Sequence, residues 1–544
     1  MKLVLIQPPI RDFYHTPIRL LPLGLAYLKA AVRKYLPGVE VVVKDFHQGW
    51  GSRTLVRPPE LDYLQPYYGL PDQSPFSTFH HYRHFGASFE TVAAETAREK
   101  PDLVGISSLF TPYYREALAC AEAVKKVLQV PVLLGGSQVS AAPGLMLAHP
   151  AVDWIVRGEG ERPLVELLKV WQDRGDLHRV PNLGFKIGRE AFFNPERENF
   201  PLDELPHPDL SDLPPARYRL GKRPLCFLIA SRGCPHHCSF CSVHLTFGHH
   251  YRRRSTDDLI REIDSRFQQG YRVFDFEDDN LTYDREEMLH LCRHLENAYP
   301  PGTIECLAMN GISCGSLDLE LLGRMKRAHF TQLNLALVSG DPHTRARVTR
   351  PESLAQYLEV VQAAHRLGFR LVSYQILGLP GETRASQIDT LRLAARLPVL
   401  IGASPFYVIP GTAVARSLPA LSEADLFRAR LTALAFESAE VIRDDLYTLL
   451  VCARIINFFK GLRFHEARWS LGEALDFARG IGKRAALGVE IFNRLVREKQ
   501  FYTATNEGLK IQPRFQAPLF FEIWDCLEAI VTQAGRKILL KKIK

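Results

Sequence analysis

Short apolar runs alternate with amphipathic stretches along two long parts of the chain, and this alternation constrains the fold more than any other feature. In residues 1–190 the apolar runs are KLVLIQPP, VEVVVKDF, PDLVGISS, VPVLLGGS and VDWIVRGEGE. The stretches between them, such as LGLAYLKAAVRKYL and REALACAEAVKKVLQ, carry apolar residues at three- and four-residue spacing, as amphipathic helices do. The regular alternation of strands and helices predicts an α/β fold, whose first domain is a Rossmann-like or flavodoxin-like doubly wound parallel sheet.

The same alternation resumes in residues 223–416, after residues 191–222, which are dense in Pro and Asp. About six βα units follow, and they predict a partial (β/α)6 barrel of the TIM type, with its functional site at the carboxyl ends of the strands. Residues 191–222 form a predicted linker. Residues 417–544 have a continuous helical pattern and predict an all-helical third domain. Within the first domain, the Pro-, Tyr- and His-rich residues from about 47 to 88 predict a long inserted loop.

Composition limits the classes of function. The chain has 544 residues, 46% of them hydrophobic, and its net charge of +8 is spread along the sequence, so charge gives no indication of nucleic-acid binding. The apolar start is too short for a signal peptide, and no run approaches the roughly 18 apolar residues of a membrane span. We therefore expect a cytoplasmic protein without a transmembrane segment. The basic ending RKILLKKIK leaves peripheral contact with an anionic membrane surface open.

Three of the ten cysteines lie close together in SRGCPHHCSFCSV. Cys234, Cys238 and Cys241 fall on the loop that leaves the first strand of the predicted barrel. A structural zinc site or an ordinary ferredoxin cluster uses four protein ligands, whereas a cubane held by three cysteines leaves one iron open to a substrate or cofactor. The triad predicts such an open iron–sulfur site. A zinc site completed by a neighbouring histidine is the alternative.

The spacing of the triad resembles that of the radical S-adenosylmethionine (SAM) superfamily. In that family the open iron of a 4Fe-4S cluster chelates SAM, and an electron from the cluster cleaves SAM to a 5'-deoxyadenosyl radical. The resemblance implies that Cys234, Cys238 and Cys241 hold the cluster and that Phe240 lies against the adenine of SAM.

Later strand ends extend this resemblance. They are the acidic EDDN, the sequence LALVSGDP, in which Val338 stands where the family usually has glutamate, and the QILGLPGET turn. Ordinary helix capping and turn chemistry are the alternative interpretation of each segment taken alone. The implied SAM-contacting residues in these segments are Glu277, Asp278, Asp279, Asn280, Ser339, Gly340, Gln375 and Gly378.

Placed before such a barrel, the first domain resembles the cobalamin-binding domain of the cobalamin-dependent radical SAM enzymes. Four segments carry the resemblance where strands pass into helices: QPP, DLVGISSLFT, LLGGSQVS and IVRGEGE. Ligands of doubly wound sheets bind at that edge. The implied cobalamin-contacting residues are Pro9, Ser107, Ser108, Phe110, Gly135, Gly136, Ser137, Gly158 and Glu159. A degenerate module that only packs against the barrel is the alternative.

The Asp-x-His-x-x-Gly signature of cobalt ligation by histidine is absent from the first domain. The nearest sequence is DFHQGW, Asp45 to Trp50, in which the glycine follows the histidine by two positions instead of three. We therefore expect cobalamin to bind without a histidine ligand.

The resemblance implies a radical enzyme with three cofactors: a 4Fe-4S cluster, SAM and cobalamin. The leading hypothesis is a methyltransferase that acts on an unactivated carbon of a small molecule or peptide. A cobalamin-assisted cyclase, oxidase or rearrangement enzyme shares the same motifs. A tRNA methylthiotransferase is disfavoured, because that class has three further cluster cysteines before the barrel, where this chain has only Cys120. A non-enzymatic iron–sulfur sensor is a further alternative. The expected partners are the substrate and a reductant such as flavodoxin or ferredoxin; the sequence indicates no hydrogen-donor or acid–base residue.

Overall fold

The computed structural model describes residues 1–540, and the chain divides into two compact units. The first unit consists of residues 1–56, 82–279 and 408–429, and the second takes residues 57–81, 280–407 and those after 429. This division runs across the predicted inserted loop and the predicted barrel. The boundaries at residues 190, 222 and 416 remain predictions.

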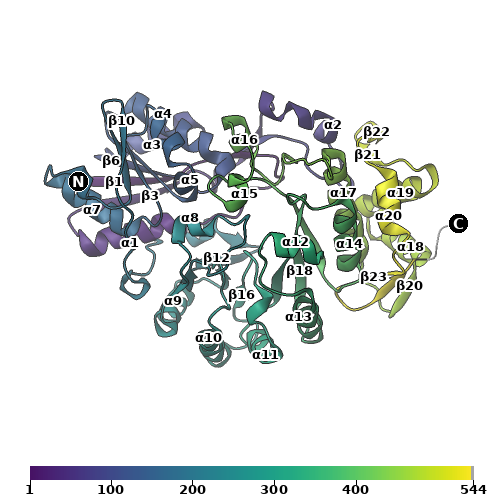
Figure 1. The fold of residues 1–544 in the computed structure, drawn as a ribbon. Helices are drawn as coiled ribbons and strands as arrows, with labels where there is room; N and C mark the ends of the chain where they lie inside the picture. Colours follow the sequence, from purple (N-terminus) through teal and green to yellow (C-terminus); the bar gives the residue numbers. More distant parts are fainter. Residues whose placement is uncertain (541–544) are drawn as a thin grey trace. The chain divides into compact units, whose positions relative to one another are not determined.

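A seven-stranded sheet lies at the centre of the first unit, in the order β10-β9-β8-β7-β6-β1-β3 (Figure 1). Its parallel strands are β1 (Lys2–Gln7), β3 (Glu40–Asp45), β6 (Leu103–Ser107), β7 (Val132–Gly135) and β8 (Trp154–Val156). Counted in chain order, these five strands stand in the order 2-1-3-4-5, which is the flavodoxin-like arrangement. The predicted doubly wound parallel sheet is confirmed for these strands.

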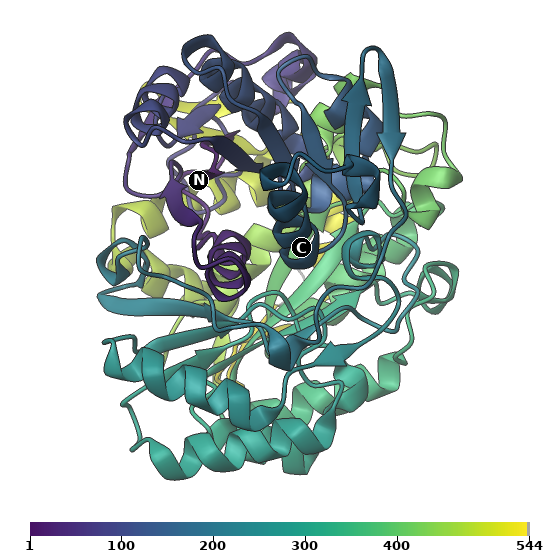
Figure 2. The same ribbon diagram turned by 90° about the vertical axis from the view of Figure 1, so that its left-hand side faces the viewer.

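Two further strands make one edge of this sheet antiparallel, which the sequence analysis did not predict. They are β9 (Leu183–Ile187) and β10 (Glu190–Phe193). They form a hairpin that projects beyond the parallel strands (Figure 2). The connection is too short for a parallel crossover, and its Gly188 has a φ of +61°, so the strands pair as a hairpin.

Helices cover the sheet because each has a continuous apolar side. The main ones are α1 (Leu23–Tyr35), α3 (Phe89–Arg98), α4 (Tyr114–Val127) and α7 (Glu161–Gln172). The helices α5 (Ser137–Ala141) and α6 (Pro143–Ala148) are short. Helix α1 packs against α7, and α3 packs against α4, as expected for helices with a three- and four-residue apolar repeat.

The prediction of one long irregular loop at residues 47–88 is wrong in part. Strands β4 (Ser52–Thr54) and β5 (Arg83–Phe85) pair with each other, and β5 pairs with β2 (Ile10–Asp12). The helices η1 (Pro59–Leu64) and α2 (Gln65–Tyr68) follow β4. These elements were missed because none exceeds six residues, too few for a periodic pattern to be recognised.

The part predicted to form the barrel has the expected succession of strands and helices. In the first unit it contains β12 (Arg223–Leu228), β13 (Ser231–Arg232), α8 (Val243–Phe247), β14 (Arg252–Arg253), α9 (Thr256–Gln268) and β15 (Val273–Phe276). Strand β11 (Arg219–Leu220) precedes them, within the predicted linker. Strands β12 and β15 are parallel.

The second unit continues this succession. It contains α10 (Arg285–Ala298), β16 (Glu305–Leu307), α11 (Leu319–Arg327), β17 (Gln332–Val338), α12 (Pro342–Arg347), α13 (Leu354–Arg366), β18 (Arg370–Leu377), α14 (Arg384–Ala395) and β19 (Leu400–Pro405). Strands β17, β18 and β19 are parallel neighbours. Helices α10, α11, α13 and α14 each begin after a side chain that accepts a backbone N–H: Asp284, Asp318, Ser353 and Thr383.

The prediction that residues 417–544 are all helical is wrong. The helices after β19 are α15 (Ala413–Arg416), α16 (Glu423–Arg428), α17 (Arg443–Lys460), α18 (Leu471–Ile481), α19 (Lys483–Glu498) and α20 (Ala517–Trp524). Five strands lie among them: β20 (Arg468–Ser470), β21 (Tyr502–Thr505), β22 (Gly508–Ile511), β23 (Ala529–Val531) and β24 (Lys537–Leu539). With three or four residues each, these strands are too short to show a two-residue alternation.

The structure contains no helix, within residues 1–540, with the length and apolar character needed to cross a membrane. The basic ending that left a membrane contact open begins with Arg536, one residue before β24, and its last four residues, 541–544, lie outside the described residues.

Candidate active site

The three clustered cysteines lie on one loop of the first unit, between β13 and α8. The loop folds back on itself, since the backbone N–H of Cys241 donates to the carbonyl of Cys238 at 3.0 Å. Gly233 begins the turn with a φ of +81°, and a Cβ there would lie 2.3 Å from the carbonyl oxygen of His250. Burial raises the pKa of the Cys241 thiol to about 11, because an apolar environment disfavours the charged thiolate.

Among residues 1–540, no group of three or more His, Cys, Asp or Glu side chains is arranged to hold a metal ion. The structure nevertheless brings Cys234, Cys238 and Cys241 together on one loop, where the thiols of Cys234 and Cys238 add to the raised pKa of Cys241. As a donor set, three thiols on a short loop suit iron in an iron–sulfur cluster, because iron in such clusters is held by thiolates.

The acidic residues after β15 hold the backbone directly before the cysteine loop. Asp278 accepts hydrogen bonds from the Ser231 hydroxyl and from the backbone N–H of Ala230. Asp279 accepts from the backbone N–H of Gly233 at 3.1 Å. Burial raises the pKa of Asp278, and it raises the pKa of Asp279 to about 6. The predicted acidic segment and the predicted cysteine loop are thus brought together.

Glu277 and Phe240 are half-buried in the same unit. A segment that the sequence analysis left at a domain boundary supports the loop near Phe240: Val414 N donates to the carbonyl of Ser239 at 3.0 Å. Gly411 also packs against the helix that follows this loop, because a Cβ at this position would lie 3.1 Å from the side chain of Leu245. No motif indicated this contact, because its two partners are far apart in the sequence.

The second unit holds the other residues predicted to contact SAM. Asn280 is buried. Ser339 and Gly340 directly follow β17, and the Ser339 hydroxyl donates to the Glu382 carboxylate at 2.8 Å. The structure thereby joins the LALVSGDP and QILGLPGET segments through Glu382, a residue that the sequence analysis did not select. Val338, in the position where the family usually has glutamate, has a φ of +69°, which is strained for a β-branched residue.

Gln375 and Gly378 belong to β18 and the turn after it. Gln375 shares a face of the strand with Ser373, whose hydroxyl accepts a hydrogen bond from Tyr357 of α13. The structure therefore places the Gln375 side chain on the face that α13 covers. Gly378 has a φ of +80°, and a Cβ would lie 2.8 Å from Leu446, which accounts for the glycine without a cofactor.

We expect the buried carboxyl of Glu382 to make stability depend on pH. Burial raises its pKa from 4.5 to about 7. The stabilising contribution of this group is therefore fully present below pH 4.5, where it is protonated in both states, and is lost as the pH rises through 7. The variant Glu382→Gln keeps an acceptor for Ser339 and carries no charge. Thermal unfolding should show it more stable than wild type at pH 8, by up to about 3 kcal/mol, and equal at pH 4.

The exposed Glu359 provides the matched control for this measurement. Glu359→Gln should follow the wild-type melting temperature at both pH values. If Glu382→Gln gave the same difference from wild type at pH 4 and pH 8, the carboxyl would not be the titrating group.

Every residue predicted to contact cobalamin lines one of two adjoining cavities in the first unit. The larger cavity encloses about 1040 Å³, including space open to solvent, and it lies among β1, β6, β7, β8, α1 and α7. Ser107, Gly135, Gly136, Ser137, Gly158 and Glu159 line it. Pro9, Ser107, Ser108 and Phe110 line the smaller cavity of about 240 Å³. Gly136 has to be glycine, because its φ is +113° and a Cβ would lie 2.6 Å from the carbonyl oxygen of Ser108.

The larger cavity also has lining residues that the sequence analysis did not select. Arg232, Thr246 and Phe247 flank the cysteine loop and line this cavity together with the residues of the flavodoxin-like sheet. The side chains before and after the three cysteines therefore form part of the wall of the cavity. Most of the wall is apolar, from residues such as Leu5, Leu25, Leu28 and Leu164.

A buried ion-pair network closes one side of this cavity. The Arg232 guanidinium contacts the carboxylates of Glu159 and Glu161, each at 2.7 Å. Arg252 also pairs with Glu159, and the Asn199 amide donates to Glu161 at 2.7 Å. Burial alone would raise the pKa of Glu161, but Arg232 outweighs burial and holds this pKa below its ordinary value. Glu159, a predicted cobalamin contact, is thus engaged by two arginines.

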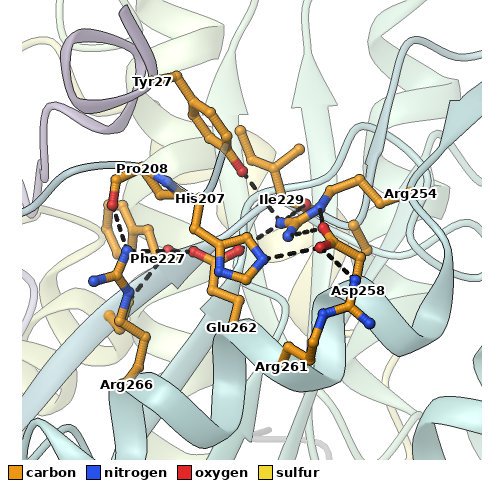
Figure 3. A network of polar contacts seen from close by, with 12 residues as sticks. Tyr27, His207, Pro208, Phe227, Ile229, Arg254, Asp258, Arg261, Glu262 and Arg266 are labelled. Carbon is orange, nitrogen blue, oxygen red and sulfur yellow. Dashed lines mark hydrogen bonds and ion pairs between the residues drawn. The ribbon is translucent and has the colours of Figure 1, made fainter. Parts of the chain in front are cut away.

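A second network connects α1 to α9 (Figure 3). Arg254 donates to Glu262 at 2.5 Å and to Asp258 at 2.6 Å, both on α9. It also donates to the hydroxyl of Tyr27 on α1 at 3.3 Å. Tyr27 lines the larger cavity, and the Arg232 guanidinium lies 5.0 Å from its ring centroid. The two networks therefore meet at Tyr27.

Two family models match the chain. The model of the radical SAM superfamily matches residues 228–394, which include the three cysteines, and the model of the B12 binding domain matches residues 78–168. The second match contains eight of the nine residues that line the two cavities as predicted, all except Pro9.

Relatives with known or assigned activities are similar at low identity. An uncharacterized methyltransferase from Pyrococcus horikoshii is 26% identical over 57% of this chain and 68% of that protein. The cytidylyl-2-hydroxyethylphosphonate methyltransferase from Streptomyces wedmorensis is 26% identical over 70% of this chain and 73% of that protein. The fold resembles that of the radical SAM methyltransferase TsrM from Kitasatospora setae with cobalamin and a [4Fe-4S] cluster bound. For TsrM the TM-score is 0.55 and the identity 18%, over 76% of this chain and 73% of that one.

Proposed function

Because this chain is a B12-binding radical SAM enzyme, related to the cobalamin-dependent radical SAM methyltransferases, we propose that it methylates an unactivated carbon of a small molecule or peptide. The larger cavity is the observation that carries this proposal. Gly135, Gly136 and Gly158 of the flavodoxin-like sheet region line its wall. The same wall contains Arg232, Thr246 and Phe247, which lie on either side of the cysteine loop in the sequence. A cofactor in this cavity would therefore lie next to the loop that is expected to hold the cluster.

The residues of the two sites suit the cofactors they are proposed to hold. Cys234, Cys238 and Cys241 would hold the 4Fe-4S cluster, and the nine cavity residues together with the apolar wall would hold cobalamin. When bound, the cluster supplies the electron for cleavage of SAM, and cobalamin supplies the methyl group. The chain positions these groups and excludes water around them, because a carbon radical reacts with whatever lies nearest.

Two groups of residues would give the sites their rigidity. Asp278 and Asp279 fasten the backbone before Cys234, and Val414 fastens the backbone at Ser239. Asp279 would also offer a carboxylate to the ammonium of SAM, an opposite charge that such a contact requires. Flavodoxin or ferredoxin is the proposed electron donor.

The test is transfer of a labelled methyl group. The full chain, reconstituted without oxygen with iron, sulfide and cobalamin and then reduced, would receive SAM with a deuterated methyl group and fractions of small molecules or peptides. We expect 5'-deoxyadenosine and a product that carries the deuterated methyl, both detected by mass spectrometry. 5'-Deoxyadenosine with a changed but unlabelled product would overturn methylation in favour of a cyclase, oxidase or rearrangement enzyme. A cluster that forms without yielding 5'-deoxyadenosine would indicate an iron–sulfur sensor.

A further inference from the structure

Gln7 ends β1 with a buried amide that is only half satisfied. Its Nε2 donates weakly to the carbonyl oxygen of Pro8, at 3.4 Å. Its Oε1 is buried and has no hydrogen-bond partner among the described residues, while the residue as a whole is 5% exposed. Turning the amide over would place two oxygens together, so the acceptor has to face away from Pro8. A buried acceptor without a donor costs free energy in the folded protein.

The unpaired amide borders both cavities. Gln7, Ser107 and Leu109 line the larger and the smaller cavity alike, so the two spaces adjoin along these residues. Ser108 lines the smaller cavity and repeats the pattern, since its hydroxyl is buried and has no partner in the described part of the chain. The chain therefore presents two unsatisfied polar groups where β1 and β6 end and a mostly apolar cavity begins.

A ligand that satisfies these groups has to bring an N–H or O–H donor to Gln7 and a polar partner to Ser108. Primary amides offer both a donor and an acceptor, and cobalamin carries primary amide side chains around its corrin ring. We propose that Gln7 and Ser108 recognise one of these corrin amides, with Gln7 Oε1 accepting its N–H. This inference rests on the proposed function, because it assigns the occupant of the cavities to cobalamin.

The proposal makes an unusual prediction for the protein without cobalamin. Replacing a residue that serves the structure should lower the free energy of unfolding. A residue that serves a ligand instead destabilises the protein when the ligand is absent. Replacing Gln7 by leucine, which has a similar volume and no polar atoms, should leave the melting temperature of the cobalamin-free protein equal to or above that of wild type. The same change should weaken binding of the ligand.

Gln138 offers a matched control. It lies on α5, it is 1% exposed, and neither polar atom of its amide has a partner among residues 1–540. It lines neither of the two cavities. Gln138→Leu should therefore relieve a similar cost in the cobalamin-free protein without changing affinity for the ligand.

The experiment uses the full-length protein and aquacobalamin, with affinity measured by absorbance titration and stability by thermal unfolding. We expect Gln7→Leu to bind about tenfold more weakly than wild type, as for one lost hydrogen bond to a buried group, and Ser108→Ala to bind more weakly as well. Gln138→Leu should bind as wild type does. Equal affinities of Gln7→Leu and wild type would overturn this inference alone. A fall of the melting temperature in cobalamin-free Gln7→Leu would also overturn it, because Gln7 would then be structural. A wild-type protein that binds no aquacobalamin would overturn the proposed function itself.

A second titration distinguishes a corrin amide from a trapped water as the donor to Gln7. Its probes are cobalamins in which one amide has been hydrolysed to a carboxylic acid, each tested separately. If an amide is the donor, one of these probes binds wild type more weakly than aquacobalamin does, because a carboxylate would face the Gln7 oxygen, and Gln7→Leu loses much of this discrimination. The same order of affinities for all probes in both proteins would assign the donor to water and overturn the proposal.

Discussion

Replacing Cys238 by alanine is expected to abolish the formation of 5'-deoxyadenosine from SAM. The variant leaves two thiols on the loop, too few to hold a cubane with one open iron. Iron should fall from about four atoms per chain to well below that value after anaerobic reconstitution. 5'-Deoxyadenosine, measured by liquid chromatography after reduction, should fall below detection.

The exposed Cys526 gives a matched control, because it belongs to the second unit and the cysteine loop belongs to the first. Cys526→Ala should keep its iron and its activity. A Cys238→Ala protein that is folded, retains its full iron content and cleaves SAM would show that the cluster is held elsewhere. Cobalamin binding by Cys238→Ala provides the check on folding, since the cavity is lined by other residues.

The largest effect on stability is expected from Arg232→Met. Arg232 is 5% exposed and is the charge partner of Glu159 and Glu161, so its loss leaves buried carboxylates without their main partner. Breaking a buried ion pair from one side costs about 3–5 kcal/mol. Urea unfolding of the first unit, followed through the fluorescence of its tryptophans, should show this loss.

Two further variants separate the charge effect from the loss of packing. The double variant Arg232→Met, Glu161→Gln should be more stable than Arg232→Met alone, because it no longer contains the buried Glu161 charge that Arg232 neutralises in wild type. Arg285 forms three ion pairs at the surface of the second unit, and Arg285→Met should cost no more than about 1 kcal/mol. Equal losses for Arg232→Met and Arg285→Met would contradict the assignment of Arg232 to a buried network.

The features that follow from local sequence pattern could be predicted. The strand order of β1, β3, β6, β7 and β8 follows from alternating apolar runs and amphipathic helices, because parallel strands joined by helices have few possible arrangements. The cavity residues could be selected for the same reason, since they lie where strands pass into helices. Short strands such as β9 and β21 escaped prediction, because a few residues cannot show a period.

Contacts between distant residues could not be predicted in the same way. The pairing of Arg232 with Glu159 and Glu161 depends on packing that no local pattern encodes, so Glu159 was selected as a cofactor contact and its two arginine partners were not. Ser339 and Glu382 belong to different turns that meet in the folded unit. Gln375 was selected from its motif, but the strand's alternation directs its side chain toward the face covered by α13.

The segment of residues 408–429 belongs to the first unit although most of the second unit precedes it in the chain. A ribosome has therefore completed all three clustered cysteines long before it makes Val414, whose N–H holds the cysteine loop at Ser239. During synthesis the loop lacks this support until late. The cluster can therefore enter a fully formed loop only after residues 408–429 have been translated. A shortened chain that stops before residue 408 would contain the three cysteines but would lack the hydrogen bond from Val414 that supports their loop.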